Sequence, residues 1–360
     1  MNIVILGLSI TSSWGNGHAT TYRGLVRALA ARGHQITFLE RDVPWYAGNR
    51  DMPEPPYCRA YLYQSPAELE PNFASVIEAA DLLVLGSYVP DGVAVADVAL
   101  RLARGVTAFY DIDTPVTLAA LQGGSAEYIE RRHIPLFDLY LSFTGGPTLD
   151  RLEKQFGARC ARPLYCSVDA DMYGEDPSIE KDIDLGYLGT YSADRQPTLD
   201  ELLIRPASAW PRGQFMVVGP QYPAGVVFPP NVERTIHLAP AHHQAFYNRL
   251  RYTLNITRRD MVAAGYSPSV RLFEAAACAT PIISDHWSGL ESFLVPGREI
   301  LLARTHQEVL AFLRDLPEGE RVAIGRRAKE RVLQSHTAAH RAAELEEYVR
   351  ARAPMPARIA

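Results

Sequence analysis

Short apolar segments alternate with longer amphipathic ones through the first half of the chain. We interpret six apolar segments as strands, at 2–8, 34–40, 58–63, 81–86, 106–110 and 137–143. The intervening segments repeat apolar residues at helical spacing; 18–33, for example, turns Leu25 and Leu29 inward and ends at Gly33. Strands that are apolar on both faces and joined through helices form parallel sheets. The pattern predicts an α/β fold built from Rossmann-like sheets.

The same alternation resumes after a polar interruption at 174–182, where we expect a domain boundary. Strands are predicted at 184–189, 214–219, 232–238, 252–256, 280–284 and 299–303, and the last helices at 305–315, 318–334 and 337–351. A chain of 360 residues is too long for one ordinary domain. We therefore expect a first domain over 1–173, a second over 183–335, and a C-terminal helix within 336–360.

One stretch of the second half, 265–297, combines a glycine turn, a helix start and a buried strand. Ser267-Pro268-Ser269 predicts a helix start with a capping hydroxyl, because serine caps helices and proline is tolerated in the first turn. The free N–H groups of such a helix, beginning near Val270, suit a phosphate. Arg271 adds positive charge, and Glu274 follows it on the same helix face.

This stretch resembles the donor site of the group 1 glycosyl transferases, and its Gly-Tyr-Ser-Pro and Arg-Leu-Phe-Glu-Ala-Ala-Ala-Cys runs are similar to the CgeB-like (spore maturation) branch. The resemblance implies the GT-B fold, in which an acceptor-side first domain and a nucleotide-sugar-binding second domain face each other across a cleft. It also implies that the C-terminal helix crosses back to the first domain. The group's E-x₇-E motif places its second Glu at Glu274, implying a ribose-binding residue that lines a wet cleft. The first Glu, which contacts the donor sugar in that group, is replaced here by Tyr266. The implied donor-binding set is Tyr266, Ser267, Ser269, Val270, Arg271 and Glu274, with Arg195 as a diphosphate ligand. Arg258, after the strand at 252–256, is either a further diphosphate ligand, since guanidinium forks suit phosphate, or a surface arginine.

In the first half, a polar loop follows the first strand. It carries Ser12, Ser13, Gly15, Asn16 and Gly17, and it lacks the third glycine of a dinucleotide-binding G-x-G-x-x-G motif. Glu40, at the end of the second strand, is weak evidence for NAD on its own. The resemblance implies that this loop faces the cleft. His18, at the following helix start, is either a cleft residue or a cap.

Two carboxylates, Asp111 and Asp113, follow the strand at 106–110. Ligands of α/β proteins bind beyond the carboxyl ends of parallel strands, so at least one of the two is expected to be a cleft residue. Asp113 precedes Thr114-Pro115 and also suits a helix cap. An inverting transfer would need a general base, for which these two residues are the candidates. A retaining transfer, usual in E-x₇-E families, would not need one.

The composition of the chain limits the kinds of binding partner and cellular location that we expect. A net charge of −5 gives no indication of a nucleic-acid surface. The four cysteines form no C-x-x-C pair and are expected to be buried thiols in a cytoplasmic protein. No apolar run is long enough to span a membrane, and the chain enters a strand at once, without a signal peptide. The histidines 237, 242 and 243 lack a carboxylate at ligand spacing, so no metal site is predicted.

Together these features predict a metal-independent, cofactor-free enzyme that moves a sugar from a nucleotide-diphosphate sugar, UDP-linked by resemblance, to a small molecule, glycan or protein. Two alternatives stay open. One is a nucleotide-sugar epimerase or hydrolase of GT-B type, which would consume the donor without an acceptor. The other is a sugar-nucleotide-binding protein without turnover.

Overall fold

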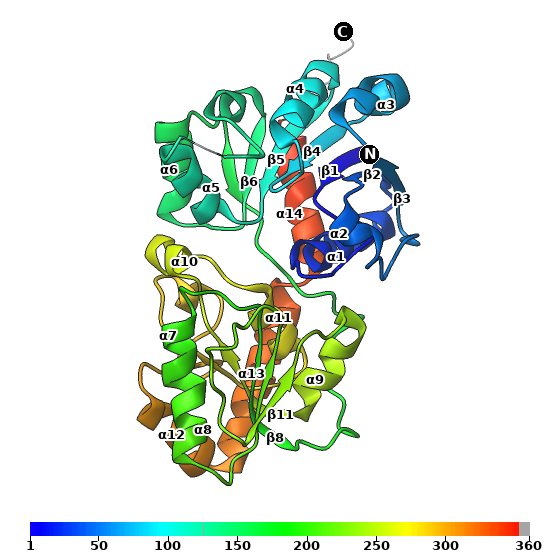
Figure 1. The fold of residues 1–360 in the computed structure, drawn as a ribbon. Helices are drawn as coiled ribbons and strands as arrows, with labels where there is room; N and C mark the ends of the chain where they lie inside the picture. Colours follow the sequence, from blue (N-terminus) through cyan, green and yellow to red (C-terminus); the bar gives the residue numbers. More distant parts are fainter. Residues whose placement is uncertain (125, 353–360) are drawn as a thin grey trace. The chain divides into compact units, whose positions relative to one another are not determined.

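A computed structural model describes residues 1–124 and 126–352, and the chain in it forms two compact units (Figure 1). The first unit is Met1–Tyr165 together with the chain from Ala338 onward, and the second is Cys166–Thr337. The division therefore precedes the polar segment 174–182 at which the sequence pattern breaks. The physical reason is that the segment after Tyr165 joins the second unit, where Val168 forms a parallel bridge with Thr337.

Seven parallel strands form the sheet of the first unit, in the order β3-β2-β1-β4-β5-β6-β7. The strands are β1 (Asn2–Gly7), β2 (Gln35–Arg41), β3 (Arg59–Tyr63), β4 (Leu82–Gly86), β5 (Val106–Asp111), β6 (Leu139–Ser142) and β7 (Ala161–Pro163). The strand order reverses between β1 and β4, and open α/β sheets bind ligands outside the carboxyl ends of strands at such a point. The loops after β1 and β5 carry the candidate residues of this unit.

Helices cover both faces of this sheet. They are α1 (His18–Ala31), α2 (Pro44–Ala47), α3 (Leu69–Glu78), α4 (Gly92–Leu102), α5 (Thr114–Gln122), α6 (Pro147–Phe156) and α14 (Ala338–Arg350), with the short 3-10 helices η1 (Pro66–Glu68) and η2 (Arg131–Leu136). Leu345 and Val349 of α14 are buried in one core layer with Leu25 and Leu29 of α1. Glu346 also accepts hydrogen bonds from Arg32. The last helix therefore completes the core of the first unit.

The second unit contains a six-stranded parallel sheet in the order β10-β9-β8-β11-β12-β13. Its strands are β8 (Ile183–Leu188), β9 (Phe215–Val218), β10 (Val232–Thr235), β11 (Leu250–Asn255), β12 (Ile282–Ser284) and β13 (Leu301–Leu302). Its helices are α7 (Gln196–Leu199), the π-helix η3 (Asp200–Ile204), α8 (Arg205–Ala209), α9 (His243–Arg249), α10 (Arg259–Ala264), α11 (Val270–Ala277), α12 (His306–Asp315) and α13 (Glu318–Ser335), with the 3-10 helices η4 (Pro240–His242) and η5 (Leu290–Ser292). The α/β fold with two parallel sheets that the sequence predicts is confirmed.

Candidate functional site

The helix α11 begins at Val270, at the carboxyl end of the second unit's sheet. Ser269 occupies the position before its first residue but makes no capping bond; its hydroxyl donates to Asn255 Oδ1 at 2.8 Å. Ser267 instead donates to the Gly265 carbonyl at 2.8 Å. The expected capping hydroxyl is therefore wrong, because the Ser269 side chain turns toward Asn255 instead of back over the first turn of the helix. The N–H groups at the start of α11 thus donate no bond to the Ser269 side chain.

Arg271 is buried in the first turn of α11 and points across the ends of β8 and β11. Its Nε donates to the Leu188 carbonyl at 2.7 Å, and its Nη1 donates to Asn255 Oδ1 at 3.1 Å. The guanidinium lies 5.0 Å from the ring centroid of Tyr187, a cation–π contact. The Arg271–Glu274 contact that their spacing suggests does not form, because Arg271 turns to the strand ends. A fixed positive charge therefore sits where α/β proteins bind ligands.

Asp285 extends this polar network, and sequence reasoning missed it. The residue directly follows β12, and its carboxylate accepts from Thr257 N at 3.1 Å and from Thr257 Oγ1 at 2.9 Å. Burial raises the pKa of Asp285 above its ordinary value, against these hydrogen bonds. Asp285 directly follows the strand Ile282–Ser284, and Asp111 was singled out because it follows a strand in the same way. The sequence pattern therefore pointed to Asp285 as well.

Glu274 is 3% exposed, so the expectation that it lines a wet cleft is wrong for this structure. Its Oε1 accepts from the Tyr173 hydroxyl at 2.8 Å and its Oε2 from the Tyr247 hydroxyl at 3.1 Å. His243 Nδ1 lies 3.3 Å from the Tyr173 hydroxyl, and the other ring nitrogen lies 3.1 Å from the Leu238 carbonyl. Burial, followed by the Glu274 charge, raises the pKa of both tyrosines well above its ordinary value. Each carboxylate oxygen already has a neutral hydroxyl partner.

Tyr266 adopts a left-handed backbone, with φ of 47°, directly after Gly265 at 66°. Its N–H donates to the Ser288 carbonyl at 2.7 Å. A Cβ added to Gly289 would lie 2.4 Å from the Tyr266 ring, so only glycine fits beneath it. A non-glycine residue in this region costs free energy, and such strain collects at ligand sites. The turn before α11 is therefore held in a defined shape.

Arg195 and Arg258 lie at the edge of the same strand ends. Arg195 Nη2 donates to the Thr190 carbonyl at 2.7 Å, while its Nε is buried without a hydrogen-bond partner in the described part of the chain. The charges of both arginines act on Asp194. Burial alone would raise the pKa of its carboxyl, but bonds from Ser192 and the Arg259 N–H, and the charges of Arg258 and Arg195, lower that pKa. Both arginines therefore belong to a charged cluster beside the loop after β8.

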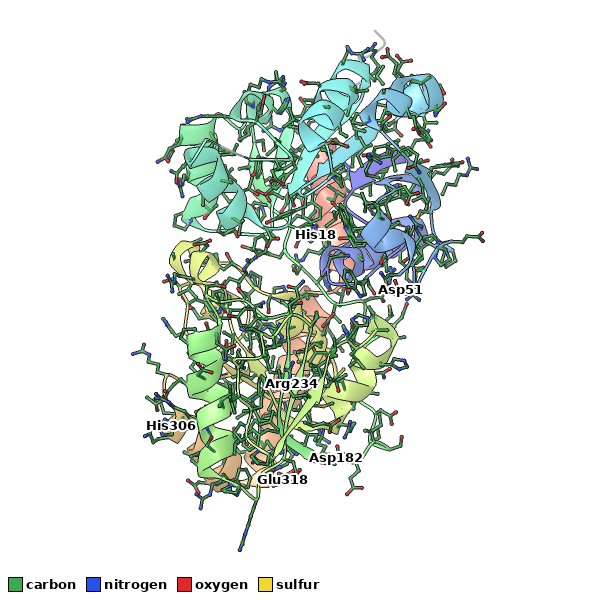
Figure 2. All side chains as sticks on the ribbon, viewed as in Figure 1. His18, Asp51, Asp182, Arg234, His306 and Glu318 are labelled. Carbon is green, nitrogen blue, oxygen red and sulfur yellow. The ribbon has the colours of Figure 1, made fainter. Side chains whose placement is uncertain are left out.

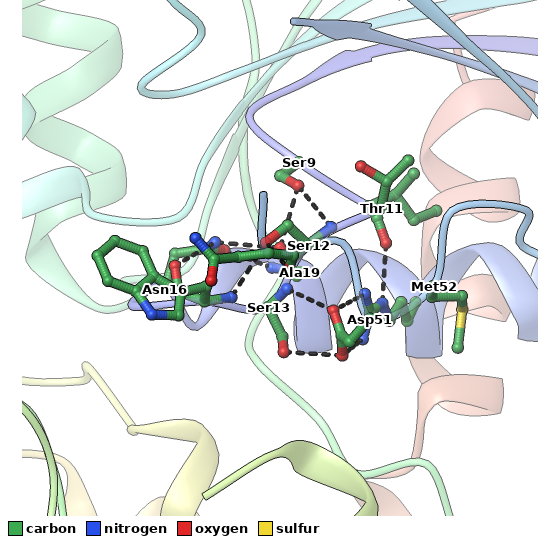
Figure 3. A network of polar contacts seen from close by, with 12 residues as sticks. Ser9, Thr11, Ser12, Ser13, Asn16, Ala19, Asp51 and Met52 are labelled. Carbon is green, nitrogen blue, oxygen red and sulfur yellow. Dashed lines mark hydrogen bonds and ion pairs between the residues drawn. The ribbon is translucent and has the colours of Figure 1, made fainter. Parts of the chain in front are cut away.

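The loop after β1 in the first unit is fixed by two carboxylates, the buried Glu40 and the partly exposed Asp51; Figure 3 shows the contacts of Asp51 with Ser13. Glu40 accepts from the N–H groups of Ile10 and Thr11, at 2.7 and 3.0 Å, and from the hydroxyls of Ser9 and Thr11, at 3.1 and 2.7 Å. This structural role accounts for Glu40 without a nucleotide. Asp51 accepts from Ser13 N and Oγ, both at 2.9 Å, and from the Arg23 guanidinium at 2.8 and 2.9 Å.

The predicted cleft residues of this loop differ in orientation. The side chains of Ser12 and Ser13 are buried, and Ser12 Oγ donates to the Asn49 carbonyl at 2.7 Å. Asn16 Oδ1 accepts from Ala19 N at 3.0 Å and so supports the first turn of α1. Gly15 and Gly17 are exposed. The two serines therefore hold the loop in place, and only its tip is open to solvent.

His18, labelled in Figure 2, lies at the start of α1, and its Nε2 is 3.4 Å from Oδ2 of Asp113, which follows β5. Their side chains are 10% and 20% exposed. Asp113 occupies the N-cap position of α5 but makes no capping bond, and Asn16 supports the start of α1. The capping alternatives for both residues therefore fail. His18 Nδ1 is buried without a partner among the described residues.

Asp111 is fully buried behind this pair. It accepts from the Tyr140 hydroxyl at 2.5 Å, from Thr117 Oγ1 at 2.8 Å and from the Asp113 N–H at 3.2 Å. Burial raises the pKa of Asp111 to about 6, against the bonds from Tyr140 and Thr117. A carboxylate enclosed in this way cannot reach an acceptor. Asp111 therefore positions the turn that carries Asp113.

Among the described residues no group of three or more His, Cys, Asp or Glu side chains is arranged to hold a metal ion. In the same part of the chain, no helix has the length and apolar character needed to cross a membrane. The four cysteines are thiols rather than disulfides, and Cys160, Cys166 and Cys278 are buried.

Comparison with solved structures assigns the fold to the GT-B class. Residues 195–347 match the family model described as "Glycosyl transferase-like". The sucrose-phosphate synthase of Thermosynechococcus elongatus superposes with a TM-score of 0.71 at 15% identity, covering 98% of this chain and 99% of that one. HepE of Anabaena, in complex with UDP and glucose, gives 0.69 at 14% identity over 97% and 99% of the two chains.

An α-glucosyltransferase in complex with UDP is similar to the same degree, with a TM-score of 0.69 at 12% identity and coverage of 97% and 99%. A search of curated proteins by sequence finds no match. The similarity at these identities concerns the fold. It extends over nearly the whole chain, both units included.

Proposed function

We propose that this protein transfers a sugar from a nucleotide-diphosphate sugar, UDP-linked, to a hydroxyl-bearing acceptor, without a bound metal ion. The observation that carries the proposal is the position of Arg271. A buried guanidinium, fixed by Leu188 and Asn255 at the start of α11, supplies positive charge at the carboxyl ends of β8 and β11. Guanidinium groups and helix starts are the protein's own means of binding a diphosphate. The match to the glycosyl transferase-like model and the UDP complexes of similar folds support the same donor.

In this proposal the second unit binds the donor. Arg271 and the N–H groups at the start of α11 neutralise the charge that develops on the departing diphosphate, and Arg195 and Arg258 add to it. Tyr266 and the serines 267 and 269 shape the turn against the donor. Glu274 accepts from the ribose hydroxyls, as its place in the E-x₇-E pattern suggests. Because Tyr173 and Tyr247 enclose Glu274, which is 3% exposed, ribose binding requires at least one of the two tyrosine side chains to move away.

The first unit supplies the base. The acceptor oxygen attacks the anomeric carbon while the bond from that carbon to the diphosphate oxygen breaks, and the acceptor proton passes to the Asp113 carboxylate. The nucleoside diphosphate leaves with the bonding electron pair. His18, at 3.4 Å, stabilises Asp113, and Asp111 holds the turn. A displacement of this kind inverts the anomeric centre.

We further propose that the protein belongs to the CgeB-like branch of the group 1 glycosyl transferases and that it is located in the cytoplasm.

The test is release of nucleoside diphosphate from a panel of nucleotide sugars, with and without an acceptor panel, followed by NMR of the product anomer. Acceptor-dependent release with inversion supports the proposal. Donor consumption that needs no acceptor would favour an epimerase or hydrolase. Binding without turnover would favour a non-catalytic protein.

A further inference from the structure

Two tryptophans project from the first unit at the carboxyl ends of its strands. Trp14 lies in the loop after β1 and is 43% exposed, and Trp45 lies in α2, after β2, and is 52% exposed. Asp113 follows β5 at the same edge of the parallel sheet. Single exposed apolar side chains are ordinary. The two exposed indoles follow the neighbouring strands β1 and β2 at the same sheet edge as the proposed base, lie outside the core and are open to a ligand.

The two indoles belong to one hydrogen-bonded frame. Ser12 Oγ accepts from Trp14 N at 3.3 Å and donates to the Asn49 carbonyl at 2.7 Å. The Asn49 amide in turn donates to the Trp45 carbonyl at 3.0 Å. Asp51 fixes the same loop through Ser13 and Arg23, in the network that Figure 3 shows. The backbones of both tryptophans are therefore tied together, and their order is established before any ligand arrives, which lowers the entropic cost of binding.

The surroundings of the indoles are polar. In the described segments 9–17 and 42–58, Trp14 and Trp45 are the large apolar side chains exposed to solvent. Asn16 and Asn49 lie beside them and present amide groups. A lipid or an apolar helix would need a continuous apolar surface, which these segments lack. The surface instead matches a ligand with a flat C–H face and a rim of hydroxyls, because indole rings attract polarised hydrogens over their faces.

We propose that Trp14 and Trp45 form the acceptor subsite and that the acceptor is a carbohydrate whose pyranose ring packs on the indoles. This inference rests on the proposed function and names the substrate class of that site. The acceptor hydroxyl would be presented to Asp113 from a ring held on the tryptophans.

The test is saccharide protection of tryptophan fluorescence from acrylamide, measured on the full chain without donor. The four tryptophans are Trp14, Trp45, Trp210 and Trp287; Trp287 is buried and Trp210 is half-buried, so quenching reports mainly the two exposed indoles. The saccharide probes are maltose, cellobiose, lactose and chitobiose. Phosphatidylcholine vesicles and octanol are the apolar probes, which test whether the two tryptophans bind a lipid or another apolar ligand instead. We expect saturable protection by at least one disaccharide.

Trp14→Ala and Trp45→Ala should each weaken that binding by about three- to tenfold, the range for an aromatic contact. Tyr61→Ala, an equally exposed aromatic at 44% on β3, is the matched control and should leave it unchanged. The inference is overturned if only vesicles or octanol protect, if no disaccharide protects, or if both tryptophan variants bind the disaccharide as tightly as the wild type. UDP titration of the same samples separates the two proposals, since UDP binding without saccharide protection defeats only this one, and saccharide protection without nucleotide binding defeats only the proposed function.

Discussion

Tyr173→Phe separates the two roles that Glu274 can have. In the structure the Tyr173 hydroxyl donates to Glu274 Oε1 at 2.8 Å, in a site where the carboxylate is almost fully buried. The variant removes that one hydroxyl and keeps the ring. A hydrogen bond to a charged group contributes about 1.5–3 kcal/mol. The nucleotide-free protein should therefore lose about that much free energy of unfolding.

If the ribose of the donor takes the place of the Tyr173 side chain at Glu274, the wild type loses the contacts of the Tyr173 hydroxyl with Glu274 and His243 on binding, and the variant does not. UDP should consequently bind Tyr173→Phe about tenfold or more tightly than wild type, since about 1.4 kcal/mol corresponds to tenfold. Gain in affinity and loss of stability should be similar in free energy, because both measure the contacts of the same hydroxyl.

The assay combines urea denaturation without ligand and UDP titration by calorimetry on the same protein. Tyr252→Phe is the matched control: Tyr252 is another fully buried tyrosine of the second unit, and its hydroxyl donates to the Phe312 carbonyl at 2.9 Å rather than to Glu274. A destabilised Tyr173→Phe protein with unchanged UDP affinity would show that the donor does not displace Tyr173, and the same result for Tyr247→Phe would refute the ribose assignment. Weaker binding would show instead that Tyr173 itself contacts the nucleotide.

Three further predictions concern the first unit and the absence of a metal requirement. Asp113→Asn should lower kcat about a hundredfold or more while leaving UDP affinity unchanged, as expected for a lost general base; unchanged kcat in steady-state assays would remove Asp113 from the chemistry. The folded-state pKa of Asp111 is raised to about 6 from 3.8, so the folded state holds this proton more tightly and Asp111 stabilises the fold less as pH rises from about 4 to about 6. Urea denaturation across that window should therefore show Asp111→Asn gaining stability relative to wild type, and a constant difference would argue against a buried carboxyl. Donor binding and turnover should survive EDTA, because Arg271 and the start of α11 take the place of a cation; loss with EDTA that Mn²⁺ or Mg²⁺ restores would contradict this.

Hydrophobic periodicity was sufficient for the fold, because the strands are apolar on both faces and the helices on one. The segment 106–110 and the observed β5 (Val106–Asp111) differ by one residue. Carboxylates after strands were likewise visible, and the structure brings Asp113 to His18, 95 positions away in the sequence. These two residues are brought together by the order of the strands in the sheet, so the local sequence pattern could not predict that they are in contact.

The environments of individual side chains could not be predicted from the sequence. Ser269 looks like a helix cap, yet the hydroxyl bonds to Asn255, a residue of β11 that reaches it only through the tertiary fold. Glu274 looks like an exposed ligand residue, yet Tyr173 and Tyr247 enclose it from segments far along the chain. Helix spacing also suggests an Arg271–Glu274 contact, but the carbonyl of Leu188 competes successfully for the guanidinium. In each case a distant partner decides the outcome.

Calorimetric titration of the full chain with UDP tests the central claim, nucleotide-sugar binding at the start of α11, most directly. UDP should bind at one site with micromolar affinity, and Arg271→Lys, which keeps the charge but loses the fork, should weaken binding about tenfold or more. Surface Arg205→Lys, in α8 and paired with Glu201, should leave affinity unchanged. Absence of heat with UDP and with ADP, GDP, CDP and TDP, or equal affinity in wild type and Arg271→Lys, would contradict the account.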